Sequence, residues 1–340
     1  MAEAQAAPKG LALQLVVTYG YMFLWIGLSA AVIMINKYVL SMSGFPYPVA
    51  LTCTHMLFCA VLAFLLVKLG FVEAVNISAD TYLSCILPIG LLFAGTLWLG
   101  NAAYLYLSVS FIQMLKASMP MVVFIVGVLF ATEKFTMKSA LNMLVVGTGI
   151  AIASYGEIHF VVVGVLLQVG SIATESVRLT LVQILLQKRG IKMNPVSTLY
   201  HIAPCCFVFL FLPFIYIELP KMVADPNLRV NVPLLLASAA CAFALNMSVF
   251  LLIGKTSALT MNVAGVIKDW LLILLSVVLY GSPVTRTQLM GYGLAFVGVM
   301  YYNYAKVEQM KQSAAAAQKA PEKQPLIAAE GGQASSKGSE

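Results

Sequence analysis

Residues 255–280 read KTSALTMNVAGVIKDWLLILLSVVLY, a stretch long and apolar enough to form a helix that crosses a bilayer. Lys268 and Asp269 lie near its middle, although a charge at the centre of a membrane helix costs about 2.5–3.5 kcal/mol on insertion scales. Charges at that depth usually face a bundle interior or a water-filled path. A structural ion pair is the alternative, but adjacent helical residues project about 100° apart. We therefore expect different partners for the two residues, and a substrate site near them.

The composition of the whole chain is that of an integral membrane protein. Its 340 residues are 61% hydrophobic and 10% charged, whereas soluble domains carry about 25% charged residues. Long apolar runs without alternation predict α-helices rather than a membrane barrel. The net charge of +7 is explained by short basic loops, so we expect no nucleic-acid partner. The six cysteines have no metal-binding spacing, and no nucleophile motif or phosphate-binding loop occurs. We expect no enzyme activity, metal or cofactor.

Windows of about 19 residues predict an all-α integral membrane fold with ten transmembrane helices. The predicted spans are 14–36, 46–67, 82–105, 108–130, 139–156, 160–186, 196–218, 232–253, 257–280 and 288–305. Ten lysines and arginines lie on the side of the membrane shared by both termini and four on the other, which places both termini in the cytosol. Residues 1–13 form a cytosolic N-terminus that is too short and too poor in arginine and serine for a transit peptide. Residues 306–340 predict a disordered cytosolic tail.

Five predicted spans precede about residue 158 and five follow it, so the two halves, 14–156 and 160–305, enter the membrane with opposite topology. The fourth and ninth spans then correspond, and each carries one lysine, Lys116 or Lys268. Inverted five-helix repeats with a substrate site between them are a recurring transporter plan. Pro120, four residues after Lys116, should kink the fourth span.

The remaining polar residues inside the spans complete a predicted substrate site. Glu175 and Arg178 are spaced i, i+3 and should pair, either to neutralise each other in the membrane or to support the site. That leaves Lys116 and Lys268 as cations for an anionic substrate, and an ammonium suits phosphate oxygens. Helix packing is the more ordinary role of intramembrane serine, threonine and asparagine. The predicted substrate-binding residues are Lys116, Lys268, Asp269, Asn246, Thr260, Asn101, Thr256 and Asn262.

The motifs SFIQMLKASMP (110–120) and GKTSALTMNVAGVIKDW (254–270) resemble the triose-phosphate translocator and nucleotide-sugar transporter family, within the drug/metabolite transporter superfamily. The resemblance covers about residues 14–305, and its Lys-Asp pair is similar to that of a plant-type subgroup. It implies ten helices in inverted repeats, strict exchange and alternating access. It also implies that Lys116 and Lys268 match the phosphate-binding lysines of plastid members. Asp269, however, stands where those members have an arginine.

A charge reversal beside a phosphate cluster argues against free phosphate or triose phosphate as substrate. The resemblance also implies that a phosphate-binding tyrosine of the plastid members' eighth helix falls near Leu245 here, where it is lost. Our main expectation is therefore a Golgi nucleotide-sugar antiporter that exchanges a UDP-sugar, a UDP-pentose being the best single candidate, for a nucleoside monophosphate. The alternatives are a sugar-phosphate/phosphate exchanger of the same fold and a non-transporting membrane adaptor. The endoplasmic reticulum is the second choice of compartment, a plastid is disfavoured, and a homodimer is left open.

Overall fold

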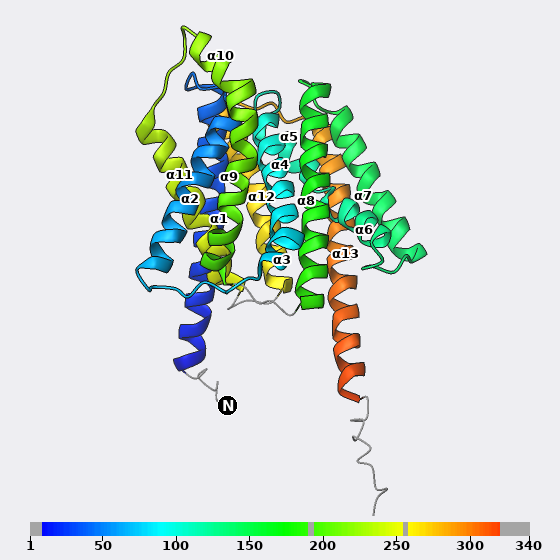
Figure 1. Cartoon of the computed structure of the whole chain (residues 1–340). Coiled ribbons are helices and arrows are strands. Elements are labelled where there is room, and N and C mark those ends of the chain that lie inside the picture. The colour runs from blue at the N-terminus through cyan, green and yellow to red at the C-terminus, as the bar shows by residue number, and fades with distance from the viewer. Residues whose placement is uncertain (1–8, 190–193, 254–257, 320–340) are drawn as a thin grey trace, which may run out of the picture.

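The computed structural model describes residues 9–189, 194–253 and 258–319, which form a helical bundle without strands (Figure 1). Its helices are α1 (Lys9–Ser41), α2 (Pro48–Lys68), α3 (Ala79–Thr81), α4 (Leu87–Ala103), α5 (Val109–Lys116), α6 (Met119–Leu129), α7 (Met137–Tyr155), α8 (Val162–Arg189), α9 (Pro195–Pro213), α10 (Leu219–Ala224), α11 (Val232–Ile253), α12 (Ala258–Tyr280) and α13 (Arg286–Lys319). Two π-helical turns, η1 (Tyr82–Ile86) and η2 (Phe214–Glu218), join α3 to α4 and α9 to α10.

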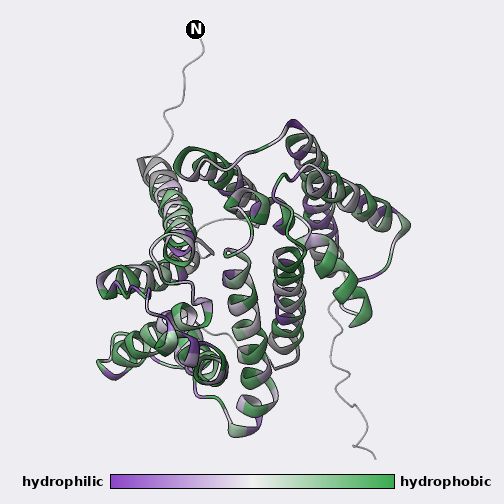
Figure 2. Ribbon diagram, turned by 90° about the horizontal axis from the view of Figure 1, so that it is seen from above, coloured by the Kyte–Doolittle hydropathy of each residue, from purple (hydrophilic) through white to green (hydrophobic). Residues whose placement is uncertain are grey.

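Seven helical stretches in the described ranges are long and apolar enough to cross a membrane. They are Tyr19–Ser41, Pro48–Lys68, Ala79–Ala103, Val109–Leu129, Met137–Tyr155, Val162–Ile184 and Val196–Ala224. Seen from above, hydrophobic residues occur on helices all round the bundle (Figure 2), as a lipid-facing surface requires. The predicted all-α integral membrane class is therefore confirmed. The number of ten spans stays a prediction.

Both ends of the described chain extend from the same side of the bundle, since α1 begins and α13 ends there (Figure 1). α13 continues to Lys319, so the last predicted span extends as a helix into the start of the predicted tail. The sequence QSAAAAQK at 312–319 explains this extension, because alanine has the highest helix propensity. Residues 1–8 and 320–340 lie outside the described residues.

The fourth predicted span is broken after Lys116, where α5 ends, and two residues separate it from Met119, where α6 begins. Pro120 has no backbone N–H to donate to Lys116, and its ring opposes a continuous helix. The hydroxyl of Ser118 donates to the carbonyl oxygen of Leu115 at 2.7 Å, which satisfies one acceptor at the break. The predicted kink is confirmed. Irregular backbone at membrane depth is tolerated where it is covered by protein or lines a cavity.

Helix contacts across the two predicted halves follow a reciprocal pattern. α4 packs against α8 and α9, and α11 packs against α1 and α2 in the same way. α2 contacts α9, α5 contacts α12, and α7 contacts α13. The counterparts in this pattern are α1 and α8, α2 and α9, α4 and α11, α5 and α12, and α7 and α13. When each helix is exchanged for its counterpart, the contacting pairs map onto one another.

The closest of these helix pairs is α7 with α13, which pack through small residues. A Cβ added to Gly149 would lie 2.4 Å from the backbone nitrogen of Ala295, and one added to Gly291 would lie 2.3 Å from that of Ala153. Such residues let membrane helices approach closely. An ion pair between Lys306 and Glu133 adds a contact between α13 and the loop that precedes α7.

Candidate functional site

A cavity of 410 Å³ lies among seven helices, and we call it the central cavity. Small-molecule sites in proteins typically measure about 300–1,000 Å³. Its walls come from both predicted halves of the chain. They are formed by Val32, Ile33 and Asn36 of α1; Thr52, His55 and Met56 of α2; Phe93, Thr96, Leu97, Gly100 and Asn101 of α4, followed by Tyr104; Lys116 of α5; Met119 of α6; Gln168, Ser171, Ile172 and Glu175 of α8; and Ala242, Leu245 and Asn246 of α11.

Lys116 lines the central cavity from the broken end of α5. The carboxylates of Glu175 and Asp269 lie near enough to act on its charge, but Lys116 forms no ion pair with any carboxylate in the described part of the chain. A cation at the C-terminal end of a helix is also favoured by the helix dipole. The structure therefore places Lys116 on the cavity wall without a direct ion-pair partner among the described carboxylates.

Lys268 and Asp269 pair with each other, and the expectation that they have different partners is wrong. The Lys268 ammonium lies 3.3 Å from the Asp269 carboxylate and 5.5 Å from the ring centre of Trp25 on α1. Although adjacent residues leave a helix in different directions, the long lysine stem can bend back along the surface. Neither residue lines the central cavity. Lys268 is still close enough to act electrostatically on Tyr104, which does.

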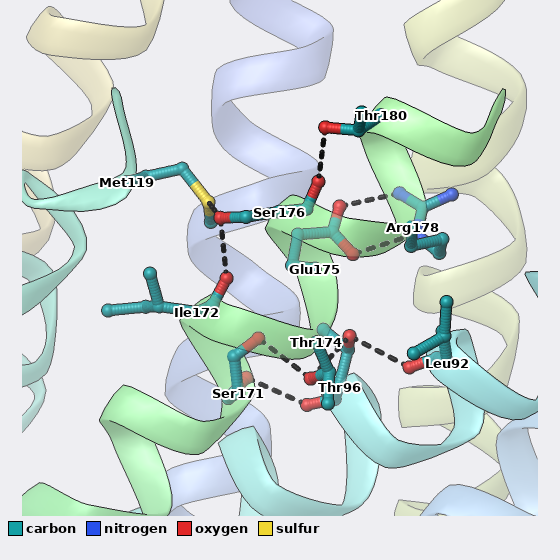
Figure 3. A network of polar contacts seen from close by, with 10 residues as sticks. All are labelled: Leu92, Thr96, Met119, Ser171, Ile172, Thr174, Glu175, Ser176, Arg178 and Thr180. Carbon is teal, nitrogen blue, oxygen red and sulfur yellow. Dashed lines mark hydrogen bonds and ion pairs between the residues drawn. The ribbon is translucent and has the colours of Figure 1, made fainter. Parts of the chain in front are cut away.

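Glu175 and Arg178 form the expected contact within α8 (Figure 3). The Arg178 guanidinium donates twice to the Glu175 carboxylate, at 2.8 Å and 2.5 Å, and lies 4.8 Å from the ring centre of Phe93. A bidentate pair of this kind compensates both charges. Glu175 lines the cavity, whereas Arg178 is not a free cation there.

Hydroxyl groups hold α8 against its neighbours (Figure 3). The Ser171 hydroxyl donates to the carbonyl oxygen of Thr96 on α4 at 2.9 Å, and the Thr96 hydroxyl donates to that of Thr174 at 3.1 Å. The Ser176 hydroxyl lies 3.6 Å from the sulfur of Met119 on α6. These contacts fix the cavity-facing side of α8 relative to the end of α5.

A buried chain of polar side chains joins α1, α2, α4 and α11 at the cavity wall. The Asn36 amide donates to the Asn101 amide oxygen at 3.3 Å, and Asn101 donates to the Thr52 hydroxyl at 3.0 Å. The Ser238 hydroxyl donates to the Asn36 amide oxygen at 2.8 Å and lies 3.0 Å from a ring nitrogen of His55. All five are buried. The amide of Asn101, a predicted substrate ligand, is thus engaged at both ends by protein.

Of the other predicted substrate ligands, the structure describes the side chain of Asn246. Asn246 lines the cavity and donates to the carbonyl oxygen of Ala242 in its own helix at 2.8 Å. Thr256 lies outside the described residues, as do the side chains of Thr260 and Asn262. Gln168 lines the cavity, yet sequence reasoning misses it, as it misses Asn36 and Ser238. Their one sequence signal is a polar residue within an apolar run, which helix packing explains equally well.

Sequence comparison identifies a family and several relatives for this chain. Residues 16–303 match the Triose-phosphate Transporter family. Three proteins of Arabidopsis thaliana, each called a "Probable sugar phosphate/phosphate translocator", are 51%, 50% and 49% identical to this chain. Each match covers 92% of this chain and 90% of the relative.

Proposed function

The chain belongs to the triose-phosphate transporter family, and from that premise we propose that it exchanges a sugar phosphate for phosphate across a membrane. It is thus a multi-pass protein of a translocator family, and membership of that family gives no support to an enzyme. The names of its Arabidopsis relatives support sugar phosphate and phosphate as the substrate pair. They favour this alternative over the nucleotide sugar expected from Asp269.

The observation that carries the proposal is the position of Lys116. An ammonium without a direct ion-pair partner among the described carboxylates, on the wall of a cavity inside an apolar bundle, favours an anionic ligand. A phosphate group supplies the charge and the acceptor oxygens, and the break between α5 and α6 leaves polar backbone groups beside it. Lys116 is proposed as the anchor of the phosphate in both exchanged substrates.

We propose that the fold works by alternating access between inverted repeats of five spans each, 14–156 and 160–305, with both termini in the cytosol. The reciprocal helix contacts support this division, because α4 relates to α8 and α9 as α11 relates to α1 and α2. Chain ends on one side of the bundle agree with an even number of spans (Figure 1).

In this scheme Lys268 contributes from the second repeat when its contact with Asp269 opens. Both side chains retain partial exposure, 20% for Lys268 and 28% for Asp269, so neither is locked in the core. Asn246 of α11, together with Thr256, Thr260 and Asn262, is proposed to complete the site. Glu175 and Arg178 support it by holding one carboxylate at a fixed distance from Lys116.

A nucleotide sugar, exchanged for a nucleoside monophosphate, is the second candidate. It is favoured by the Lys268–Asp269 pair, because Lys116 is then the one lysine on the described cavity wall without a direct ion-pair partner. A diphosphate diester needs fewer local cations than a phosphate dianion. This candidate goes with the Golgi membrane, and with the endoplasmic reticulum as the second choice. Fluorescent tagging of the full chain beside Golgi and endoplasmic reticulum markers tests that assignment.

Exchange assays separate the candidates. Purified protein is reconstituted in liposomes that contain inorganic phosphate, UMP or neither, and the liposomes are offered labelled glucose 6-phosphate or UDP-sugars. Uptake of glucose 6-phosphate that requires internal phosphate is the expected result. Uptake of a UDP-sugar that requires internal UMP supports the second candidate instead. Uptake independent of the internal solute contradicts exchange, and no uptake in any arm supports a non-transporting adaptor.

A further inference from the structure

The central cavity contains one amide side chain that the protein leaves without a hydrogen bond. Four amides line the cavity in the described part of the chain: Asn36, Asn101, Gln168 and Asn246. Asn36 and Asn101 bind each other and the hydroxyls around them, and Asn246 donates to the backbone of its own helix. Gln168 is 1% exposed, and both its amide nitrogen and its amide oxygen lack a partner.

A buried amide without partners is unfavourable, and more so inside a membrane protein. Buried polar groups are nearly always paired, so an exception calls for an explanation by function or by an absent ligand. Gln168 is one of the residues that line the cavity, although only 1% of its surface is exposed, and its amide has both a donor and an acceptor to offer. The unsatisfied donor and acceptor of the Gln168 amide therefore point to a molecule that enters the cavity.

The position of Gln168 along the axis of α8, relative to Lys116, indicates which part of a substrate it would contact. Gln168, Ile172 and Glu175 share one face of the helix and all line the cavity. At a rise of about 1.5 Å per residue, Gln168 lies roughly 10 Å along the axis from Glu175. The contact between Ser176 and Met119 sets the start of α6 level with the middle of α8.

Lys116 precedes Met119 by three residues, and α5 and α8 both begin on the side of the bundle that carries the turn after α4. Gly164 shows this for α8, since a Cβ there would meet Tyr106 and Leu107 at 2.7 Å. Lys116 is therefore roughly level with Ile172, and Gln168 lies about one helical turn beyond it, away from Glu175. A substrate with its phosphate on Lys116 can extend its uncharged part toward Gln168.

Resting on the proposed function, we infer that Gln168 binds hydroxyl groups of the sugar part of the substrate and so distinguishes a sugar phosphate from inorganic phosphate. A neutral amide cannot compensate phosphate charge, but its N–H and C=O match a hydroxyl that both accepts and donates. Lys116 would then give affinity for any phosphate, while Gln168 would add affinity only for phosphates that carry hydroxyls.

The test uses Gln168→Leu, which keeps a similar volume and removes both hydrogen-bonding atoms. Gln183→Leu, on an exposed position of the same helix, is the matched control. Both variants are reconstituted in liposomes with the wild-type protein. We expect Gln168→Leu to raise the half-saturating concentration of glucose 6-phosphate about tenfold and to leave phosphate–phosphate exchange unchanged. Glycerol 3-phosphate should also lose its advantage over propyl phosphate as a competitor, because the two differ only in hydroxyls.

Two further results keep the inference falsifiable. Without substrate, Gln168→Leu should melt at a higher temperature than the wild type, because it removes an unsatisfied buried amide. A lower melting temperature, or an equal fall in both exchange reactions, would show that Gln168 is structural and would overturn the inference. Unchanged glucose 6-phosphate exchange in the variant overturns it as well. If the wild-type protein itself does not exchange glucose 6-phosphate for phosphate, the proposed function is wrong. That result differs from the ones that overturn the role of Gln168.

Discussion

The ammonium of Lys268 lies 3.3 Å from the carboxylate of Asp269, its neighbour in the chain, while Lys116 has no such partner among the described carboxylates. The two lysines, which the sequence predicts to correspond between the halves, are therefore unequal in their direct ion pairs. Asp269 lies near both, since it pairs with Lys268 and acts on the charge of Lys116. We propose that its carboxylate sets how much positive charge a substrate meets.

Asp269→Asn should make the protein bind compact phosphates more tightly, because Lys268 would lose its compensating charge. We expect the half-saturating concentration of inorganic phosphate to fall by about five- to tenfold. Asp269→Arg, which adds a cation, should shift preference further toward inorganic phosphate over larger organic phosphates. Competition between phosphate and glucose 6-phosphate in liposomes measures this. Glu308→Gln, at an exposed acid on α13, is the control, and an equal response from it would refute the role of Asp269.

Gly291→Ala should destabilise the protein, because its Cβ would meet the backbone of Ala153 at 2.3 Å and neither helix can yield without moving. Gly293→Ala is the matched control on the same helix, with nothing within 4 Å of the added Cβ. Alanine there should be neutral or stabilise by about 0.5–1 kcal/mol. Thermal unfolding in detergent measures both variants. Equal melting temperatures would contradict the close packing of α7 on α13.

Asn101→Ala should lower stability more than it changes substrate affinity, although the sequence predicts Asn101 as a ligand. The variant leaves Asn36 and Thr52 without their partner, and each buried orphan costs about 1–3 kcal/mol. Asn246→Ala removes only a contact within one helix and should leave stability nearly unchanged. Melting temperature and half-saturating substrate concentration are measured for both. A stable Asn101→Ala protein with weakened substrate binding would restore Asn101 as a ligand.

Glu157 lies between α7 and α8, outside the membrane-spanning stretches. We expect its carboxyl group to make the stability of the protein depend on pH. Burial raises its pKa above the ordinary value of 4.5, although the Gln288 amide and the His159 backbone N–H both donate to its carboxylate. The folded state therefore holds the proton more firmly than the unfolded state. Its contribution to stability is greatest below pH 4.5 and is lost as the pH rises through the folded-state pKa.

Glu157→Gln cannot ionise, so it avoids the loss of stability that ionised Glu157 causes. The variant should therefore melt about 2 °C higher than the wild type at pH 7.5. The gain should be smaller at pH 5. Melting curves at the two pH values measure it, with Glu308→Gln as the exposed control. A variant that melts lower than the wild type at pH 7.5 would show that the ionised carboxylate stabilises the fold.

Sequence reasoning predicts the membrane class and the helical stretches here because apolar runs report directly on burial in lipid. It also predicts the break after Lys116 and the Glu175–Arg178 contact, since both depend on residues close in the chain. It fails where the outcome depends on distant neighbours or on side-chain reach. The chain from Thr52 to Asn101, Asn36 and Ser238 joins four helices, and Lys268 bends back to Asp269 rather than away from it. Gln168 can be recognised as a candidate ligand only from the structure, which shows that its amide has no hydrogen-bond partner among the described residues.

The most direct test of the account is phosphate-dependent exchange by Lys116→Met in liposomes. Lys221→Met is the control, because Lys221 is an exposed lysine of α10 outside the central cavity. If Lys116 anchors the phosphate, Lys116→Met should reduce glucose 6-phosphate/phosphate exchange about 100-fold while the control retains wild-type exchange. Wild-type exchange by a correctly folded Lys116→Met protein would contradict the account.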